Sequence, residues 1–386
     1  MAQELAFAML NPYTISKSRT GNVIARYVGR TDLRLAAARM FGPSRQLVAE
    51  YAEHVRRADP EHAETCALIS DYIAREYAPD PDTGRPSRVL LLLFEGEDAV
   101  RKIWNVTGSV TLRWGSGQTI RETYGDYIPD ETGGVKYFEP AVLASPSPER
   151  ARGTLRLWAK YAASDGGLIE TPRDLDDDHE TTLVMLKPDN FRAPSLRAGN
   201  IIDLLSSSGL RIIGAKKFWM SVAQAEEFYG PVRESLRSKF GDIGCERLRE
   251  AVRDEFGFVL PGETARELCE RMSACFADHE FDQIVQFMAG RKPSECDPRT
   301  RAEPGTESCL ALVYAGAGAV GRIRELLGST DPKKARPGSV RREFGSNILV
   351  NAAHASDSPE NAEREMRIID VEEDTIAPLV EKYYGT

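Results

Sequence analysis

The sequence lacks the marks of several classes of protein. Its uninterrupted apolar runs, such as Val89 to Phe94, are far too short to cross a bilayer. The first residues, Met1 to Glu4, lack the basic and then apolar build of a signal peptide. Acidic residues outnumber basic ones, 59 against 50, and the formal net charge of −9 disfavours a nucleic-acid or membrane partner. We therefore expect a cytoplasmic protein that binds neither.

Cysteine and histidine are also scarce. The six cysteines form no CxxC pair, and no histidine has metal-ligand spacing to both Cys269 and Cys275, the closest two. Scattered cysteines of this kind are typical of reduced thiols in a cytoplasmic protein. We expect no metal site built from protein ligands.

The length indicates two domains. A chain of 386 residues can bury two separate cores. The stretch from Ser164 to Glu180 is acidic and contains glycines, which is typical of a solvated connector. This interpretation gives a domain at 1–163, a linker at 164–180 and a domain at 181–386.

Among the five histidines, His354 has the most informative surroundings. Alanines flank it on both sides, and the run Ser356–Ser358 follows with two hydroxyls and a carboxylate. Small neighbours leave an imidazole accessible, and a neutral imidazole can act as a nucleophile. A single histidine is nevertheless more often a structural residue in a turn, so the neighbouring segments decide its interpretation.

Basic and hydroxyl side chains precede this histidine in a segment punctuated by glycine and proline. An amphipathic helix is predicted from about Ala319 to Leu327, and it carries Arg324. The loop after it contains Thr330, and Arg341 follows. Guanidinium groups match phosphate oxygens, and a hydroxyl adds a neutral donor. Each arginine alone is most simply a solvated surface charge, whereas the group predicts a phosphate-binding loop.

Two charged residues extend this group. Lys187 closes the apolar strand Thr182–Leu186, and the proline after it fixes the direction in which the chain leaves the sheet. Glu365 lies on the core-facing stripe of a helix that is predicted downstream. Either Arg364 or Arg367 screens this carboxylate at the surface, or it contacts the imidazole from behind and orients the ring.

At these positions the chain resembles the nucleoside diphosphate kinase family. In that family the active-site stretch has the same spacing, the first strand ends in Lys-Pro-Asp, and a glutamate hydrogen-bonds the histidine. The resemblance covers roughly residues 180–370, and more faintly the first half. It rests on Lys187–Asp189, Arg324, Thr330, Pro332, Pro337–Arg341, Asn351, His354, Ser356–Ser358 and Glu365.

The resemblance implies a fold and an activity. The fold is α+β, with two tandem ferredoxin-like βαββαβ domains. The activity is ping-pong transfer of the γ-phosphoryl group of ATP to nucleoside diphosphates, with Mg²⁺ held mainly by the nucleotide phosphates. Family members assemble, so homo-oligomers built from intrachain pseudo-dimers are expected. The implied catalytic residues are His354, Lys187, Glu365 and Ser356, and the implied phosphate and sugar contacts are Lys187, Arg324, Thr330, Arg341 and Asn351.

The sequence departs from the family between Tyr229 and Phe281, where a short passage has become much longer. The insert, at about 231–277, alternates charged and apolar residues and is predicted to be helical. In the family this passage carries the aromatic residue that stacks on the base. Tyr229 and Phe281 are therefore candidate base contacts, with Ile348 opposite Phe281.

The first half repeats the pattern without its chemistry. The replacements are Asn11 for Lys187, Trp104 for Arg324, Val110 for Thr330 and Leu143 for His354, whereas Arg121 matches Arg341. A leucine cannot accept a phosphoryl group, so we expect this half to be catalytically silent. A structural role, as the partner of a pseudo-dimer within one chain, is favoured over ligand sensing. No residue gives positive evidence for ligand sensing.

Two other functions stay open. If the insert blocks turnover, the chain is a nucleotide-binding regulatory or scaffolding protein. Alternatively, His354 passes its phosphoryl group to a protein or a small metabolite. Transfer from ATP to GDP, tested beside His354→Ala, separates these hypotheses from the kinase.

Overall fold

The computed structural model describes residues 3–110, 116–132, 134–169 and 179–385, and only the backbone of residues 239 and 241–243. These residues form two compact units, each of which is described by itself. The first comprises residues 1–218 and 309–386, and the second residues 219–308. The acidic run predicted as a linker lies largely outside the described residues. The predicted boundaries at 163 and 180 stay predictions.

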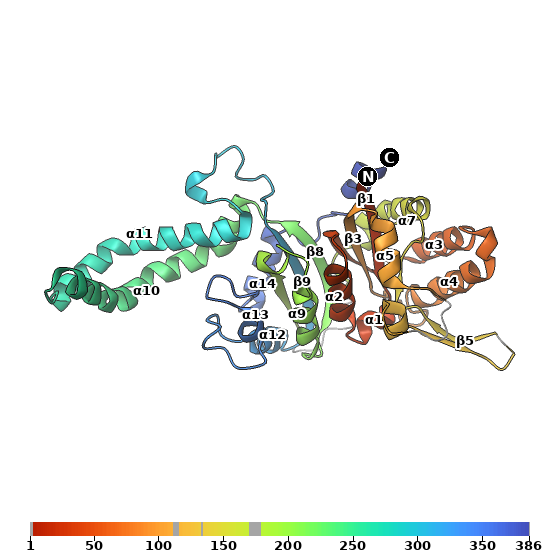
Figure 1. The fold of residues 1–386 in the computed structure, drawn as a ribbon, viewed down its shortest axis with the longest axis horizontal. Helices are drawn as coiled ribbons and strands as arrows, with labels where there is room; N and C mark the ends of the chain where they lie inside the picture. Colours follow the sequence, from red (N-terminus) through yellow and green to blue (C-terminus); the bar gives the residue numbers. More distant parts are fainter. Residues whose placement is uncertain (1–2, 111–115, 133, 170–178, 386) are drawn as a thin grey trace. The chain divides into compact units, whose positions relative to one another are not determined.

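One sheet organises the first unit (Figure 1). Its strands follow the order β10-β7-β9-β8-β2-β3-β1-β6, and a separate hairpin pairs β4 with β5. The strands are β1 Gln3–Leu10, β2 Arg34–Phe41, β3 Val89–Glu97, β4 Asp126–Pro129, β5 Val135–Glu139, β6 Val142–Leu143, β7 His179–Leu186, β8 Arg211–Trp219, β9 Ser308–Ala317 and β10 Ala353–Ala355.

The two halves of this sheet have the same strand order. The orders β6-β1-β3-β2 and β10-β7-β9-β8 both correspond to the ferredoxin-like βαββαβ arrangement. The strands are continuous apolar runs because the sheet is buried, and every residue from Leu5 to Leu10 is buried. The predicted fold class is confirmed.

Helices connect the strands of each half. In the first half they are α1 Pro12–Ser16, α2 Thr20–Arg30, α3 Arg45–Arg56, η1 Pro60–His62, α4 Ala63–Glu76, α5 Ala99–Thr107, α6 Ile120–Tyr124, α7 Pro148–Lys160 and α8 Ala162–Asp165. In the second half they are η3 Pro188–Asn190, α9 Arg197–Ser206, α12 Ala319–Leu327, α13 Val340–Phe344, α14 Pro359–Ile368 and α15 Ala377–Tyr384. The helix predicted at 319–327 is confirmed.

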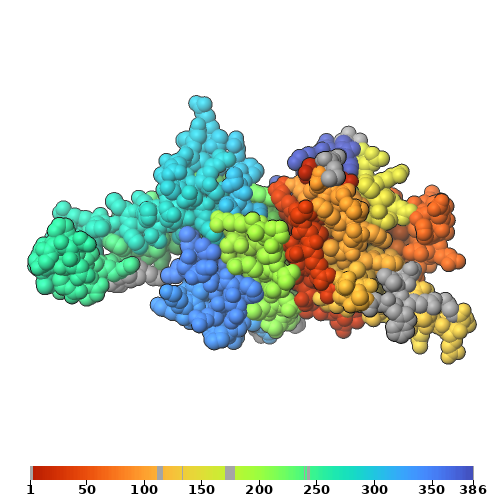
Figure 2. All heavy atoms as spheres, in the orientation of Figure 1, coloured from red at the N-terminus to blue at the C-terminus, as the bar shows by residue number. Residues whose placement is uncertain are grey.

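The halves join through their second strands. β2 pairs with β8, with Arg39 opposite Lys216. Beside this seam α2 packs against α9, and Figure 2 shows their surfaces, red and light green, in contact. A Cβ on Gly21 would lie 2.4 Å from the carbonyl oxygen of Gly199, and one on Gly199 would lie 2.3 Å from that of Gly21. The two helix backbones therefore meet directly, and each position requires a residue without a side chain.

The C-terminal helix binds the two halves together. α15 packs on α7 and β1 of the first half. The Tyr384 hydroxyl donates to the Leu5 carbonyl at 2.6 Å, and the Tyr383 hydroxyl donates to Glu95 at 2.9 Å. The end of the chain thus stabilises the first half, to which it does not belong in sequence.

The second unit is a helical hairpin. α10 spans Val222–Phe256 and starts at Ser221, whose hydroxyl accepts from the Gln224 amide at 3.1 Å. Gly257, in the left-handed conformation, ends it, and α11 spans Gly262–Ala289. The short turn η4 follows at 293–295. The predicted helical insert is confirmed. Within the described ranges, none of the helices combines the length and apolar character that crossing a membrane requires.

Candidate active site

His354 lies in the middle of β10, the edge strand of the second half. It pairs with Met185 of β7. The flanking Ala353 and Ala355 are buried, whereas 21% of the histidine side chain is exposed. The sheet therefore fixes the backbone and leaves part of the ring open to solvent.

Glu365 and Ser356 hold the imidazole. His354 Nε2 lies 2.9 Å from Glu365 Oε2, and the Ser356 hydroxyl donates to the same oxygen at 2.6 Å. Glu365 is buried on α14, whose N-cap is Ser358. Arg364 lies 3.8 Å from the other carboxylate oxygen. Of the partners left open for Glu365, the histidine is therefore the close one.

Lys187 anchors a second group. Its Nζ donates to Asn351 Oδ1 at 2.7 Å and to the Leu349 carbonyl at 3.3 Å. Burial, and then the nearby charge of Arg341, lower the pKa of Lys187 to about 8. Asn351 in turn donates to the carbonyl of Thr330 at 3.2 Å. The ammonium, the amide and the predicted phosphate-binding loop are therefore connected.

The two arginines are held differently. Arg341 donates through Nε and Nη2 to the Ala353 carbonyl, both at 3.3 Å, and through Nη1 to the Gly328 carbonyl at 2.9 Å. Arg324 is exposed on α12, and its guanidinium makes no hydrogen bond or ion pair with another described residue. The Thr330 side chain is exposed as well. Arg341 is thus fixed beside the histidine strand, whereas Arg324 and Thr330 are available to a ligand.

A strained residue leads into β10. Ala352 has a φ of 69°, in the left-handed region that residues with a Cβ rarely adopt. Its carbonyl accepts from the Lys187 amide at 2.9 Å and from the Asn190 side chain at 2.7 Å. These buried bonds offset a strain of about 1–3 kcal/mol. Asn190 was not among the predicted site residues, and its place directly after Lys187–Asp189 was the available signal.

The predicted base contacts fall in different units. Tyr229 and Phe281 belong to the helical hairpin, where both are buried and the Arg233 guanidinium lies 5.4 Å from the centroid of the Phe281 ring. Ile348 belongs to the first unit, and 62% of it is exposed. Their roles in binding a base stay predictions.

The first half has the same backbone positions with other side chains. Met9 of β1 pairs with Leu143 of β6, as Met185 pairs with His354. Leucine therefore occupies the histidine's place in the register of the sheet. No nucleophilic group replaces it at this position.

The retained arginine of the first half is bound to the backbone. Arg121 donates to the carbonyls of Val142, at 3.0 Å, and Gly108, at 2.7 Å. These bonds match those that Arg341 makes in the second half. The Arg121 guanidinium also lies 5.2 Å from the centroid of the Trp104 ring, so an indole stands where the second half has an exposed arginine.

Comparisons with known proteins match the second half. The family model for nucleoside diphosphate kinase matches residues 180–242 and 303–374. A nucleoside diphosphate kinase of Bdellovibrio bacteriovorus is 30% identical over 189 residues, which are 49% of this chain and 91% of the relative. One of Wolinella succinogenes is 31% identical over 187 residues, 48% of this chain and 92% of the relative. The chain belongs to the nucleoside diphosphate kinase family.

Membership confirms the resemblance and the class of enzyme, a kinase that transfers phosphoryl groups between nucleotides. The matched ranges contain every predicted catalytic and phosphate-binding residue of the second half. Among solved structures, an NDP kinase from Pyrobaculum aerophilum is 27% identical, covers 49% of this chain and 94% of that chain, and has a TM-score of 0.34.

Proposed function

We propose that this chain transfers the γ-phosphoryl group of ATP to nucleoside diphosphates through a phosphohistidine at His354. The observation that carries the proposal is the 2.9 Å contact between His354 Nε2 and the buried Glu365 carboxylate. A carboxylate accepts hydrogen bonds, so this contact favours the ring form protonated at Nε2. Nδ1 is then the nitrogen with a lone pair, and we assign the phosphoryl group to it.

Each half-reaction exchanges one bond for another. Nδ1 attacks the γ-phosphorus, the N–P bond forms, and the bond to the bridging oxygen breaks so that ADP leaves with its electron pair. A terminal oxygen of the acceptor diphosphate then attacks the same phosphorus, and the imidazole leaves. The role of Glu365 is to orient the ring and to stabilise the positive charge that it acquires while the N–P bond exists.

The positive side chains are assigned to the phosphate oxygens. Phosphoryl transfer spreads charge over the equatorial oxygens, and preorganised cations stabilise it without rearrangement. Arg341 and Lys187 are held by hydrogen bonds before any substrate arrives. Arg324, exposed on α12, is assigned to the outer phosphates, and Asn351 with Lys187 to the sugar hydroxyl.

We treat Mg²⁺ as part of the substrate. The described part of the chain gathers no group of three or more histidine, cysteine, aspartate or glutamate side chains that could hold a metal ion. Magnesium is commonly bound through nucleotide phosphates and water, which requires no such group. These residues therefore fit an ion that enters and leaves with the nucleotide.

We infer that the first half has no catalytic activity and has a structural role. Leu143 at the nucleophile position supports silence, and the β2–β8 seam with the α2–α9 contact supports a pseudo-dimer inside one chain. Homo-oligomers built from such pairs, and a cytoplasmic location, belong to the same proposal.

Incubation of the full chain with ATP and Mg²⁺, followed by intact mass measurement and a chase with GDP, tests the proposal. We expect one acid-labile phosphoryl group that disappears as GTP forms. His354→Ala should form no adduct, whereas His279→Ala, at an exposed position of α11, should behave as the unsubstituted chain. No adduct would indicate a nucleotide-binding protein without turnover, and an adduct that no nucleoside diphosphate removes would indicate a different acceptor.

A further inference from the structure

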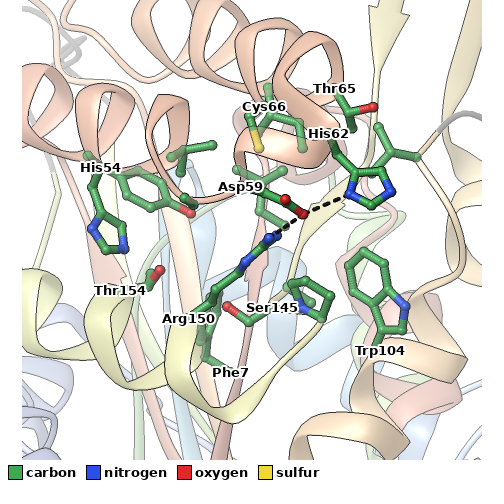
Figure 3. Close-up of a pocket in the computed structure, with 18 of the residues that line it drawn as sticks. Phe7, His54, Asp59, His62, Thr65, Cys66, Trp104, Ser145, Arg150 and Thr154 are labelled. Atoms are coloured by element: carbon green, nitrogen blue, oxygen red, sulfur yellow. Dashed lines mark hydrogen bonds and ion pairs between the residues drawn. The ribbon is translucent and has the colours of Figure 1, made fainter.

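The first half contains a cavity of about 400 Å³ (Figure 3). Its wall includes the residues that stand for the histidine, the helix arginine, the threonine and the loop arginine of the second half, which are Leu143, Trp104, Val110 and Arg121. The cavity thus lies where the other half has its active site. Cavities of roughly 300–1,000 Å³ are typical of small-molecule sites.

The charged groups in this wall are held by other groups of the protein. Arg121 is buried and bound to two backbone carbonyls, which leave its positive charge in place. Arg150 forms an ion pair with Asp59, and His62 Nδ1 lies 2.9 Å from the same carboxylate (Figure 3). The Arg150 guanidinium holds the pKa of Asp59 at about 2, so at neutral pH this pair has no net charge. Burial lowers the pKa of His54, which favours its neutral form.

A phosphorylated ligand would therefore meet fewer cations here than in the second half. Arg121 keeps the place of Arg341, but Asn11 and Trp104 stand where the second half has Lys187 and the exposed Arg324. Transfer of a multiply charged phosphate chain out of water with so few partners is unfavourable. The cavity therefore disfavours nucleotides, although it lies at the position of a nucleotide site.

The rest of the wall suits a flat, uncharged molecule. Phe7, Ile69 and Leu143 supply apolar surface, and the Trp104 indole adds a face for stacking. In the view of Figure 3, His54 and Thr154 lie at the left, and His62 and Trp104 at the right, with the Asp59–Arg150 pair between them. The wall therefore offers hydrogen-bonding groups as well as apolar surface.

We propose that this cavity binds an uncharged planar heteroaromatic molecule up to the size of a nucleoside. The apolar part of the wall holds the ring, and the imidazole, hydroxyl and carboxylate groups of the wall bind its polar edge. The first half is then a ligand site besides being a structural partner. This goes beyond the proposed kinase activity, and it stands even if His354 forms no adduct.

Adenosine and guanosine are the probes, titrated into the full chain by calorimetry. We expect at least one to bind with a Kd below about 1 mM, and its monophosphate to bind more weakly to this cavity. Thr65→Trp, on the α4 wall, should weaken nucleoside binding at least about tenfold. Glu64→Trp, its exposed neighbour outside the wall, and Lys187→Met, in the other half, should leave it unchanged.

The proposal is overturned if neither nucleoside binds, or if binding survives Thr65→Trp. A second test uses the unsubstituted chain, because Cys66 also lines the cavity and can report its occupation. A bound nucleoside should slow alkylation of Cys66 by N-ethylmaleimide and leave the exposed Cys275 unaffected. Equal protection of both cysteines, or of neither at saturating nucleoside, would contradict the assignment.

Discussion

In both halves of the first unit, a left-handed alanine leads to the position of the nucleophile, with φ of 60° at Ala141 and 69° at Ala352. In both, a buried side chain donates to that alanine's carbonyl at 2.7 Å, from Thr14 in one half and Asn190 in the other. Two residues further on, one half has leucine and the other histidine. Strained backbone often marks a functional site. Here it persists without the nucleophile, so the fold's own hydrogen bonds are enough to retain it.

The position of Lys187 has a different environment in the first half, where Asn11 occupies it. Asn11, at the place of Lys187, donates to Glu139 at 3.0 Å and accepts from the Tyr77 hydroxyl at 2.7 Å. Tyr72 donates to the other oxygen of Glu139 at 2.6 Å. Burial raises the pKa of Glu139. The first half therefore has a buried hydrogen-bond network where the second half has a titratable ammonium.

Among the paired substitutions, removal of the carboxylate that contacts His354 should give the largest difference in transfer rate between the two halves. Glu365→Gln deprives the imidazole of its charged partner, and transfer from ATP to GDP should fall on the order of 10²- to 10⁴-fold. Thr154→Val, at the corresponding position of the first half, should leave the rate unchanged. Steady-state assays of both variants measure this difference. Comparable losses would mean that the first half takes part in catalysis.

Substitution of Lys187 should affect catalysis, whereas substitution of its counterpart Asn11 should affect stability. Lys187→Met should lower the transfer rate on the order of 10²- to 10³-fold, because one preorganised cation is lost. Asn11→Leu leaves buried polar groups unpaired, so it should lower the free energy of unfolding by about 1–3 kcal/mol. Urea denaturation and rate assays on both variants test this. A catalytic loss in Asn11→Leu at unchanged stability would contradict the comparison.

Substitution of either glycine at the crossing of α2 and α9 should lower the stability of the protein. Gly21→Ala and Gly199→Ala each place a Cβ within 2.4 Å of backbone atoms of the facing helix. Each should lower the free energy of unfolding by about 1–3 kcal/mol. Gly321→Ala, where a Cβ meets open space on α12, should be neutral or slightly stabilising. Sensitivity at only one of the two crossing glycines would argue against a reciprocal seam.

Raising the pH above about 8 should weaken nucleotide binding by the second half. With the pKa of Lys187 lowered to about 8, the ammonium is lost above that pH. Nucleotide affinity should then fall by up to about tenfold per pH unit. The unfolded lysine, with a pKa of about 10.4, binds more protons than the folded one between these values, so the free energy of unfolding rises there with pH. Lys187→Met should abolish the trend in KM measurements. In urea denaturation it should reduce the slope, to which Lys217, with a pKa lowered by burial to about 7, also contributes.

Local patterns made much of the site predictable. The distance along a helix from Ser358 to Glu365 placed a carboxylate towards His354, and apolar periodicity gave α12 and the helical insert. The sequence could not show that β2 and β8 join the halves, since edge pairing depends on how complete sheets meet. The cavity of the first half could not be predicted from the sequence either. Asp59 and Arg150 lie on separate elements, and only the fold brings them together.

We propose that one of two similar halves performs the chemistry, through His354. Peptide mapping of the full chain after incubation with ATP and Mg²⁺ distinguishes the halves, because His54 and His62 line the cavity at the equivalent position of the first half. We predict a phosphoryl group on the peptide that contains His354 and none on the peptides that contain His54 or His62. Phosphorylation of either of those two histidines, or labelling that persists in His354→Ala, would contradict it.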